Sequence, residues 1–350
     1  MSMSLKRLLC GVIMVAFAGC SSPPAEPPQT PEMKAGMAHL QALADQGFLE
    51  GLAYGVSPRT YTGGGVRLRH GLYGGTRPHP VDDPTGRKLN ADKPRLRDIR
   101  LVVPTSTAWN HSTAPYWWAI VCMNAGDLGH ISWDAGDNGK LREFYLSRLQ
   151  TMEGKHAKTI GPIPDIQQFP LDTPGAATPV ASGCVPTAAG SLIAYHAGGA
   201  AAAWRGGADD VGIVRRIRGR LDMTVIPDAE GFADGKMALA GCHDEALPDA
   251  LRADAEACGV KADVAYHPFV YQDYKAEIDA RRPCLLSCVV PLPAKPQLIW
   301  GHEVVGAGYA EAEGVELVGV IDNFIGAGTP GATRWVRRDV FEGMVTVRLR

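Results

Sequence analysis

The sequence predicts an α+β protein with more than one domain, on three observations. Glycine and proline, at 41 and 26 of 350 residues, exceed ordinary usage, which favours many turns and short strands. Stretches with helical spacing are concentrated between positions 184 and 258, and short apolar stretches typical of strands follow position 283. The second half therefore predicts helices first and a β unit after them, and the first half predicts mostly β structure.

The N-terminus predicts an export signal with a lipid-attachment site. Two basic residues precede an apolar run, residues 8–18, that is too short to span a bilayer as a stable helix. The run ends in Phe-Ala-Gly before Cys20, which resembles a bacterial lipobox, so Cys20 would become the acylated first residue. An ordinary signal peptide cut nearby is the alternative. We expect residues 1–19 to be removed and residues 20–32, rich in Pro and Ser, to form a tether.

These features predict a cell-envelope lipoprotein whose membrane contact is its lipid anchor. We expect it to face the periplasm or the cell surface. Ser21, directly after the cysteine, resembles lipoproteins sent to an outer membrane, which is therefore the expected location if the host has one. No later apolar run predicts a membrane helix. The formal charge of −2 offers no basic surplus, and no phosphate loop of the G-x-x-x-x-G-K-[ST] type occurs. We therefore expect no nucleic-acid partner.

Residues 33–157 predict an accessory domain of mostly β character. Its first stretch has apolar residues on one side at helical spacing, and later prolines limit the chain to short strands. Nothing in this half indicates chemistry. The expected elements are a helix at 32–45, a short strand at 66–70, a hairpin of strands 116–123 and 130–133, and a helix at 142–152.

Residues 158–350 predict a second domain. Residues 163–169 are expected to be extended, because each proline disfavours helix in the residue before it. An alanine-rich helix begins near Cys184 and ends at the glycine pair 198–199. The other expected elements are helices at 209–221 and 245–258 and strands at 283–291, 303–309, 316–322, 334–337 and 344–349.

Cys184 is expected at the N-terminus of a helix, a position that favours its reactive thiolate form. The helix terminus stabilises negative charge by about 0.3–1 kcal/mol at an exposed site, which is less than one pKa unit. A nearby imidazolium is needed for a larger effect. His196 would lie about 18 Å along the same helix at 1.5 Å per residue, so it is excluded.

His302 is the better candidate for this imidazole. It begins the expected strand 303–309, and Asp322 ends the expected strand 316–322. If these strands are antiparallel neighbours, the start of one lies beside the end of the next, which brings His302 and Asp322 together. A carboxylate there would hold the imidazole tautomer and favour its charged form.

Four short motifs carry a resemblance to a known family. They are Gly183-Cys184-Val-Pro-Thr-Ala-Ala, Arg282-Pro283 before an apolar strand, Gly301-His302-Glu-Val-Val-Gly-Ala-Gly-Tyr, and Val320-Ile-Asp322-Asn-Phe. Together they resemble papain-like cysteine peptidases, in particular the bacteriocin-leader-processing (double-glycine) type and its stand-alone bacterial relatives, over about residues 160–330. The resemblance implies a helical subdomain packed on an antiparallel β subdomain. It also implies that Cys184 is the nucleophile, His302 the general base and Asp322 the residue that orients it.

The resemblance further implies a glutamine whose side-chain amide helps to bind the oxyanion, together with the backbone N–H of the cysteine. Gln168 has the expected spacing after Pro164, and Gln167 is the alternative. Val185 departs from the family, which usually has glycine after the nucleophile. We expect this valine to crowd the cleft or to alter the first subsite.

Each candidate also has an ordinary structural explanation. A lone cysteine is most often a buried thiol, a lone histidine bonds to backbone, an Asp-Asn pair forms a turn, and a lone glutamine is a solvated side chain. Only the combination of the cysteine, the histidine, the aspartate and the glutamine is specific for a catalytic site. Cys242 and Cys258 could pair geometrically, but a zinc site made from them and His243 lacks a recognised spacing. The remaining cysteines are expected to be small buried hydrophobic side chains.

The sequence thus predicts thiol-dependent hydrolysis of peptide bonds, with a peptide or protein as substrate and no metal or organic cofactor. A catalytically inactive relative that binds peptide in the same cleft is the first alternative. Acyl transfer by the same residues to an amine acceptor is the second.

Overall fold

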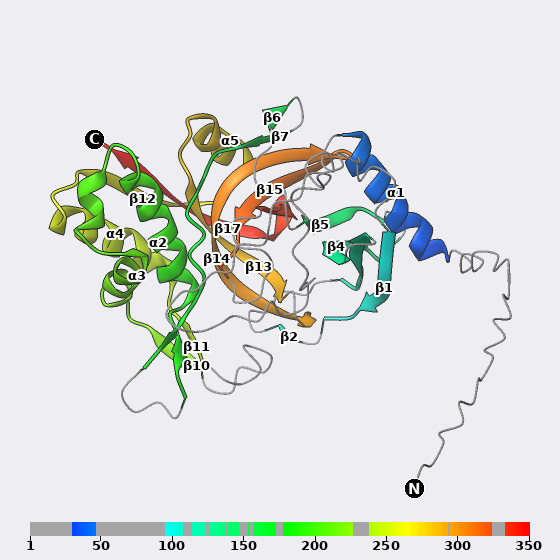
Figure 1. Cartoon of the computed structure of the whole chain (residues 1–350), viewed down its shortest axis with the longest axis horizontal. Helices are drawn as coiled ribbons and strands as arrows, with labels where there is room; N and C mark the ends of the chain where they lie inside the picture. The colour runs from blue at the N-terminus through cyan, green and yellow to red at the C-terminus, as the bar shows by residue number, and fades with distance from the viewer. Residues whose placement is uncertain are drawn as a thin grey trace, which may run out of the picture.

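The fold is a mixed α+β structure with one large antiparallel sheet and a few helices (Figure 1). The α+β class expected from the sequence is therefore confirmed. The computed structural model describes residues 30–46, 95–104, 106–107, 114–123, 126–136, 139–146, 153–154, 157–172, 178–226, 238–292, 295–323 and 333–350. The expected lipidation site Cys20, the signal peptide and the strand at 66–70 lie outside these residues and stay predictions.

The main path of the sheet contains strands from both halves of the chain. The neighbouring strands pair antiparallel, and the long curved strand β14 crosses the centre of the molecule (Figure 1). In spatial order the strands are β1 (Arg95–Val102), β3 (Tyr116–Met123), β4 (Gly126–Asp134), β5 (Leu141–Leu146), β16 (Thr333–Arg337), β15 (Val315–Ile321), β14 (Lys295–Ala312), β13 (Cys284–Leu292), β17 (Phe341–Leu349) and β12 (Ala262–Pro268).

Short strands complete the described β structure. One of them, β2, pairs with β14 in parallel, and β7 pairs with both β14 and β6. Two small sheets lie apart from the large one, β8 with β9 and β10 with β11. The bounds are β2 (Ser106–Thr107), β6 (Glu153–Gly154), β7 (Ala157–Thr159), β8 (Pro170–Leu171), β9 (Val180–Ala181), β10 (Thr224–Ile226) and β11 (Leu239–Gly241).

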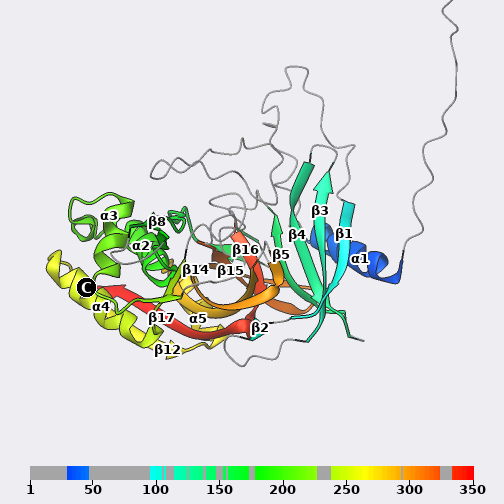
Figure 2. The same ribbon diagram turned by 90° about the horizontal axis from the view of Figure 1, so that it is seen from below.

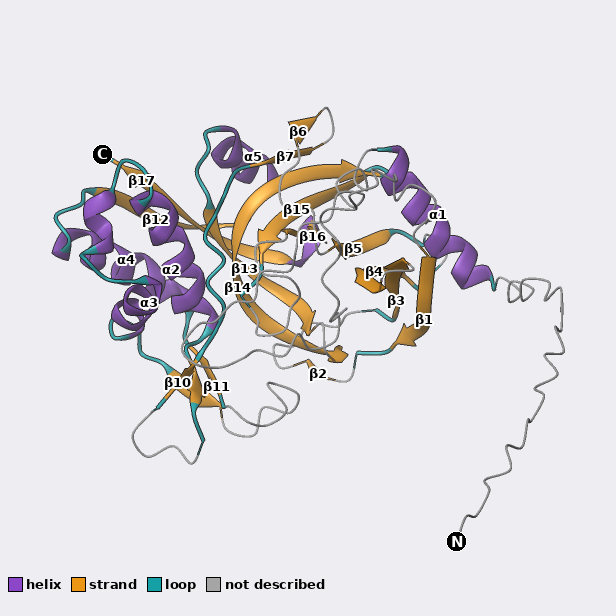
Figure 3. Cartoon of the chain, in the orientation of Figure 1, coloured by secondary structure: helices purple, strands orange, loops and turns teal. Residues whose placement is uncertain are grey.

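Most helices gather at one end of the molecule, and α1 lies at the opposite end (Figures 2 and 3). Helix α2 is buried along nearly its whole length, because its own side chains are apolar or small on all sides. The helices are α1 (Pro31–Asp45), α2 (Cys184–Ala197), α3 (Asp210–Arg218), α4 (Leu247–Ala257) and α5 (Tyr271–Asp279), with short 3₁₀ turns η2 (Ala202–Arg205), η4 (Asp244–Ala246) and η5 (Arg338–Val340). None of the helices in these described stretches is long and apolar enough to span a membrane.

Two expectations from the sequence are wrong. Residues 142–152 were expected to form a helix, but Leu141–Leu146 is strand β5, which pairs with β4 on one side and β16 on the other. These pairings bury Phe144 completely and outweigh the local helix preference. In addition, β14 begins at Lys295, so His302 lies inside a strand and does not begin one. Helix α5 was not expected at all.

The sheet continues across the boundary expected at residues 157 and 158. Strand β5 pairs with β16, with Trp335 opposite Phe144, and β7 pairs with β14. Buried apolar side chains form one cluster around α2, β13 and β14 and another around β4, β5 and the far end of β14. Strands of the expected accessory domain therefore share one sheet with the strands that carry His302.

Candidate active site

Cys184 is the first residue of α2, as expected. Gly183 caps the helix with a φ of 93°, and a Cβ atom there would come within 2.7 Å of Met223 Cε. The Thr187 hydroxyl donates to the Gly183 carbonyl at 2.5 Å, and a second hydrogen bond of 2.8 Å joins it to Ser182. These contacts determine where the helix begins, and so they determine the position of the thiol.

Cys184, Gln168 and His302 line one cavity of about 440 Å³. Its walls come from the start of α2, from β11 and η4, and from the strands β13, β14 and β17. Val185 is buried and also lines this cavity. The three residues therefore reach a common space from separate elements, the extended segment, the first helix turn and a central strand.

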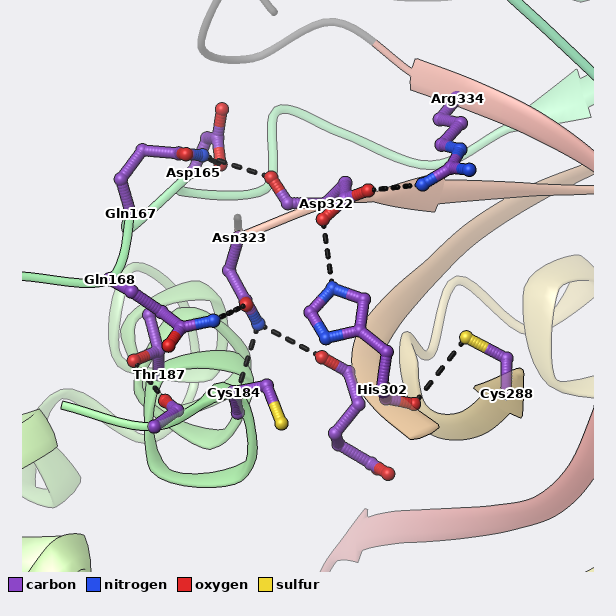
Figure 4. A network of polar contacts seen from close by, with 12 residues as sticks. Asp165, Gln167, Gln168, Cys184, Thr187, Cys288, His302, Asp322, Asn323 and Arg334 are labelled. Atoms are coloured by element: carbon purple, nitrogen blue, oxygen red, sulfur yellow. Dashed lines mark hydrogen bonds and ion pairs between the residues drawn. The ribbon is translucent and has the colours of Figure 1, made fainter. Parts of the chain in front are cut away.

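His302 and Asp322 lie side by side, with 2.9 Å between Nε2 and Oδ1 (Figure 4). Because β14 and β15 are antiparallel and Val305 pairs with Ile321, the residue just after β15 lies beside β14 near Val304, two positions along that strand from His302. Both side chains are buried. Figure 4 shows the other ring nitrogen of His302, Nδ1, on the side of Cys184.

A buried chain of charges extends from Asp322 into the N-terminal half. Arg334 on β16 donates to Asp322 Oδ2 at 2.8 Å and to Glu143 Oε2 at 2.7 Å. Glu143 on β5 in turn contacts His130 Nε2 at 2.6 Å. Burial opposes the ionisation of Glu143, but the neighbouring charges of Arg334 and His130 lower its pKa to about 2. Arg334 shares its short strand with a second arginine, Arg337, so no pattern in the sequence singled out this buried chain of charges.

Of the two candidate glutamines, Gln168 faces the cavity. Its Nε2 donates to Asn323 Oδ1 at 3.1 Å, and it is 2 % exposed. Gln167 Nε2 instead donates to Asp165 at 2.6 Å and to the Asp322 carbonyl at 2.9 Å, and Gln167 is not among the cavity-lining residues. The preference for Gln168 over Gln167 therefore agrees with the geometry.

Asn323 joins the parts of the site, a role that the sequence did not indicate. Its Nδ2 donates to the carbonyls of Cys184 at 3.1 Å and Glu303 at 2.9 Å. These two bonds orient the amide so that Oδ1 faces Gln168, which in turn presents a nitrogen to Asn323. In the sequence, Asn323 stands only as the neighbour of Asp322 in a family motif, with a turn as its ordinary structural explanation.

Ionisation of the Cys184 thiol is strongly disfavoured in this structure. Burial is the main cause, the nearby carboxyl groups of Glu303 and Asp244 add to it, and together they raise the pKa of Cys184 to about 12. A backbone hydrogen bond from Glu303 opposes this effect. The thiol is therefore neutral at pH 7.

Cys242, Cys258, Cys284 and Cys288 are free thiols. Cys288 is buried on β13 and donates to the His302 carbonyl with 3.4 Å between Sγ and O. Within the described stretches, no group of three or more His, Cys, Asp or Glu side chains is placed to hold a metal ion. Cys242, His243 and Cys258 thus do not form a metal cluster.

The described site combines a thiol at a helix N-terminus, an imidazole beside a carboxylate and a buried amide close to the thiol. No protein-family model matches the chain, and a search of curated proteins finds no similar sequence. The function of the site is therefore inferred from these side chains and their geometry.

Proposed function

We propose that the chain is a papain-like cysteine peptidase that hydrolyses peptide bonds. The observation that carries the proposal is that His302, which Asp322 contacts at 2.9 Å, lines the same cavity as Cys184. A nucleophile, a base and a group that orients the base are the three parts that covalent acyl transfer requires. Three separate segments of the chain supply them.

In the proposed reaction, His302 Nδ1 takes the proton from Cys184 Sγ as the sulfur attacks the peptide carbonyl carbon. The Asp322 carboxylate accepts a hydrogen bond from Nε2, so Nε2 carries the proton of the neutral ring. Nδ1 therefore acts as the base. The C–N bond then breaks, and the imidazolium gives its proton to the leaving amine. Water attacks the thioester, His302 takes a proton from it, and the free acid and the thiol result.

Gln168 and the backbone N–H of Cys184 would bind the oxygen that becomes negative in the transition state. Gln168 Nε2 gives one hydrogen to Asn323, and its second hydrogen would point to the oxyanion. The loss of one such donor typically lowers the rate by about 10²–10³-fold. Gln168 would therefore matter for rate more than for substrate binding.

The raised pKa of Cys184 favours a second candidate, a domain that binds peptide without cleaving it. A thiol with a pKa of about 12 holds a negligible thiolate fraction at pH 7. In this alternative the cavity would accept a peptide, but the sulfur would not attack it. Transfer of the acyl group to an amine in place of water is a third use of the same residues.

Thiol labelling tests the proposal directly. We expect a peptidyl epoxide probe to modify Cys184, measured by intact mass and peptide mapping. We expect His302→Ala to slow this labelling by at least about 10²-fold, the usual size of a general-base contribution. Cys242→Ala is the matched control, because Cys242 lines the same cavity and its loss should leave the labelling of Cys184 intact.

The outcomes separate the candidates. Labelling at Cys184 that does not depend on His302 would contradict the peptidase mechanism. An inert thiol combined with peptide binding would favour the non-catalytic binder. If Cys184 is reactive, incubation with a peptide library and an added amine distinguishes hydrolysis from acyl transfer by the mass of the product. The Cys184→Ala protein should yield neither product.

A further inference from the structure

The wall of the cavity next to Cys184 is acidic. Glu303, Asp244 and Glu342 all line it, and none of the described lining residues is Lys or Arg. The three carboxyl groups come from β14, from η4 and from β17. A hydrogen bond from Ser287 and the nearby His243 favour ionisation of Asp244.

Glu303 has a carboxylate oxygen that nothing in the described structure satisfies. The residue is 1 % exposed, and its Oε2 accepts a hydrogen bond from Ser287 Oγ at 2.9 Å. Its other oxygen, Oε1, is fully buried and has no hydrogen-bond partner among the described residues. Buried polar atoms are nearly always satisfied, so an unsatisfied oxygen on a carboxyl group that lines a cavity indicates a missing partner.

The electrostatics of Glu303 favour a positively charged partner. Burial, together with the nearby Asp244, raises the pKa of Glu303 well above its usual range. Burial likewise raises the pKa of Asp244. A cation in the cavity would reverse these effects, because an opposite charge stabilises an ionised carboxylate. It would also offset the negative charge that helps to keep the neighbouring thiol protonated.

We propose that this cavity is a subsite for a cationic group of the substrate, the ammonium of a lysine or the guanidinium of an arginine, which Glu303 and Asp244 recognise beside Cys184. The inference rests on the proposed function, since it takes the substrate to be a peptide. The cavity has the size of typical ligand sites, and a charged donor that reached the Glu303 carboxyl group would supply the partner that Oε1 lacks.

Peptide binding to the Cys184→Ala protein tests the subsite without cleavage. The probes are eight-residue Ala/Gly peptides in which a single lysine is moved through every position, each matched by a peptide with norleucine at that position. Norleucine retains most of the aliphatic side chain but lacks the charge. We expect one or two adjacent lysine positions to bind at least tenfold more tightly than their norleucine matches, measured by calorimetry.

Two further variants, each made in the Cys184→Ala protein, test whether Glu303 is the residue that recognises the lysine. Glu303→Gln keeps the shape and the Ser287 contact, and we expect it to reduce the lysine preference to less than threefold. Glu245→Gln is the matched control, because Glu245 is exposed next to Asp244 but does not line the cavity, and we expect the preference to remain. Thermal unfolding of each variant shows that the fold is intact.

Binding that never favours lysine over norleucine, including no binding at all, would overturn the subsite. A lysine preference that survives Glu303→Gln would overturn the assignment of Glu303. These results are independent of thiol labelling: a lysine preference lost in Glu303→Gln, together with an inert Cys184, would retain the subsite and reject the peptidase.

Discussion

At the scale of single residues, His196 is a buried titratable group outside the proposed reaction. It lies in the last turn of α2, 8 % exposed, with its ring stacked on Trp204 at 6.0 Å between centroids. Its Nε2 atom is buried and has no hydrogen-bond partner among the described residues. Burial therefore lowers the pKa of His196 from its ordinary value of 6.5 to about 4.

This shift predicts a pH-dependent stability. Below pH 6.5 the unfolded chain binds a proton at His196 that the folded chain does not bind until about pH 4, so acidification favours unfolding in this window. We expect a loss on the order of 2–3 kcal/mol in the free energy of unfolding between these limits. Urea unfolding at a series of pH values measures it.

The control is His196→Phe, which retains an aromatic ring against Trp204 but cannot bind a proton. We expect its free energy of unfolding to change less than that of the parent protein between pH 6.5 and 4. Parallel curves for the two proteins would show that His196 is not the group responsible.

At the scale of elements, Arg334 connects three strands. It lies on β16 and donates to Glu143 on β5 and to Asp322 just after β15, and all three side chains are almost completely buried. We expect Arg334→Met to lower the free energy of unfolding by about 3–5 kcal/mol, because it removes the guanidinium that two buried carboxylates share. Urea unfolding at neutral pH measures this loss.

Arg337→Met is the matched control on the same strand. Arg337 also pairs with two carboxylates, those of Asp134 and Asp339, but its side chain is 20 % exposed. Exposed ion pairs contribute less than about 1 kcal/mol, so we expect a small effect. Equal losses for the two variants would contradict a special role for the buried chain.

At the scale of the whole molecule, the shared sheet makes the C-terminal half depend on the N-terminal half. Residues 158–350 expressed alone would lose the pairing of β16 with β5, the contact between Arg334 and Glu143, and the stacking of Trp335 on Phe144. An exposed strand edge of this kind favours aggregation. We expect this fragment to unfold at a lower temperature than the whole chain and to self-associate in size-exclusion chromatography.

A chain that begins at Thr30 is the control for this truncation, because it keeps every contact described here. We expect its unfolding midpoint to match that of the whole chain. A monomeric 158–350 fragment with an unchanged midpoint would instead show that the second half folds as an independent domain.

The sequence by itself determined the α+β class, the helix that begins at Cys184 and the meeting of His302 with Asp322. Each of these depends on short-range information. The helix follows from helix-forming residues after a glycine, and the meeting of His302 with Asp322 follows from two antiparallel strands joined by a tight connection, in which the start of one lies beside the end of the next. The same reasoning failed for residues 142–152, where pairing with distant strands outweighed local preference.

Only the tertiary structure decided the surroundings of these residues. Arg334 and Glu143 are 191 positions apart in the chain, and Asn323 and Cys184 are 139 apart, so no local pattern could indicate their contacts. The acidic wall at Glu303 and the raised pKa of Cys184 likewise depend on burial, which the fold as a whole creates. Local sequence specifies which groups are present and where each element begins, but charge and exposure depend on what packs around a residue.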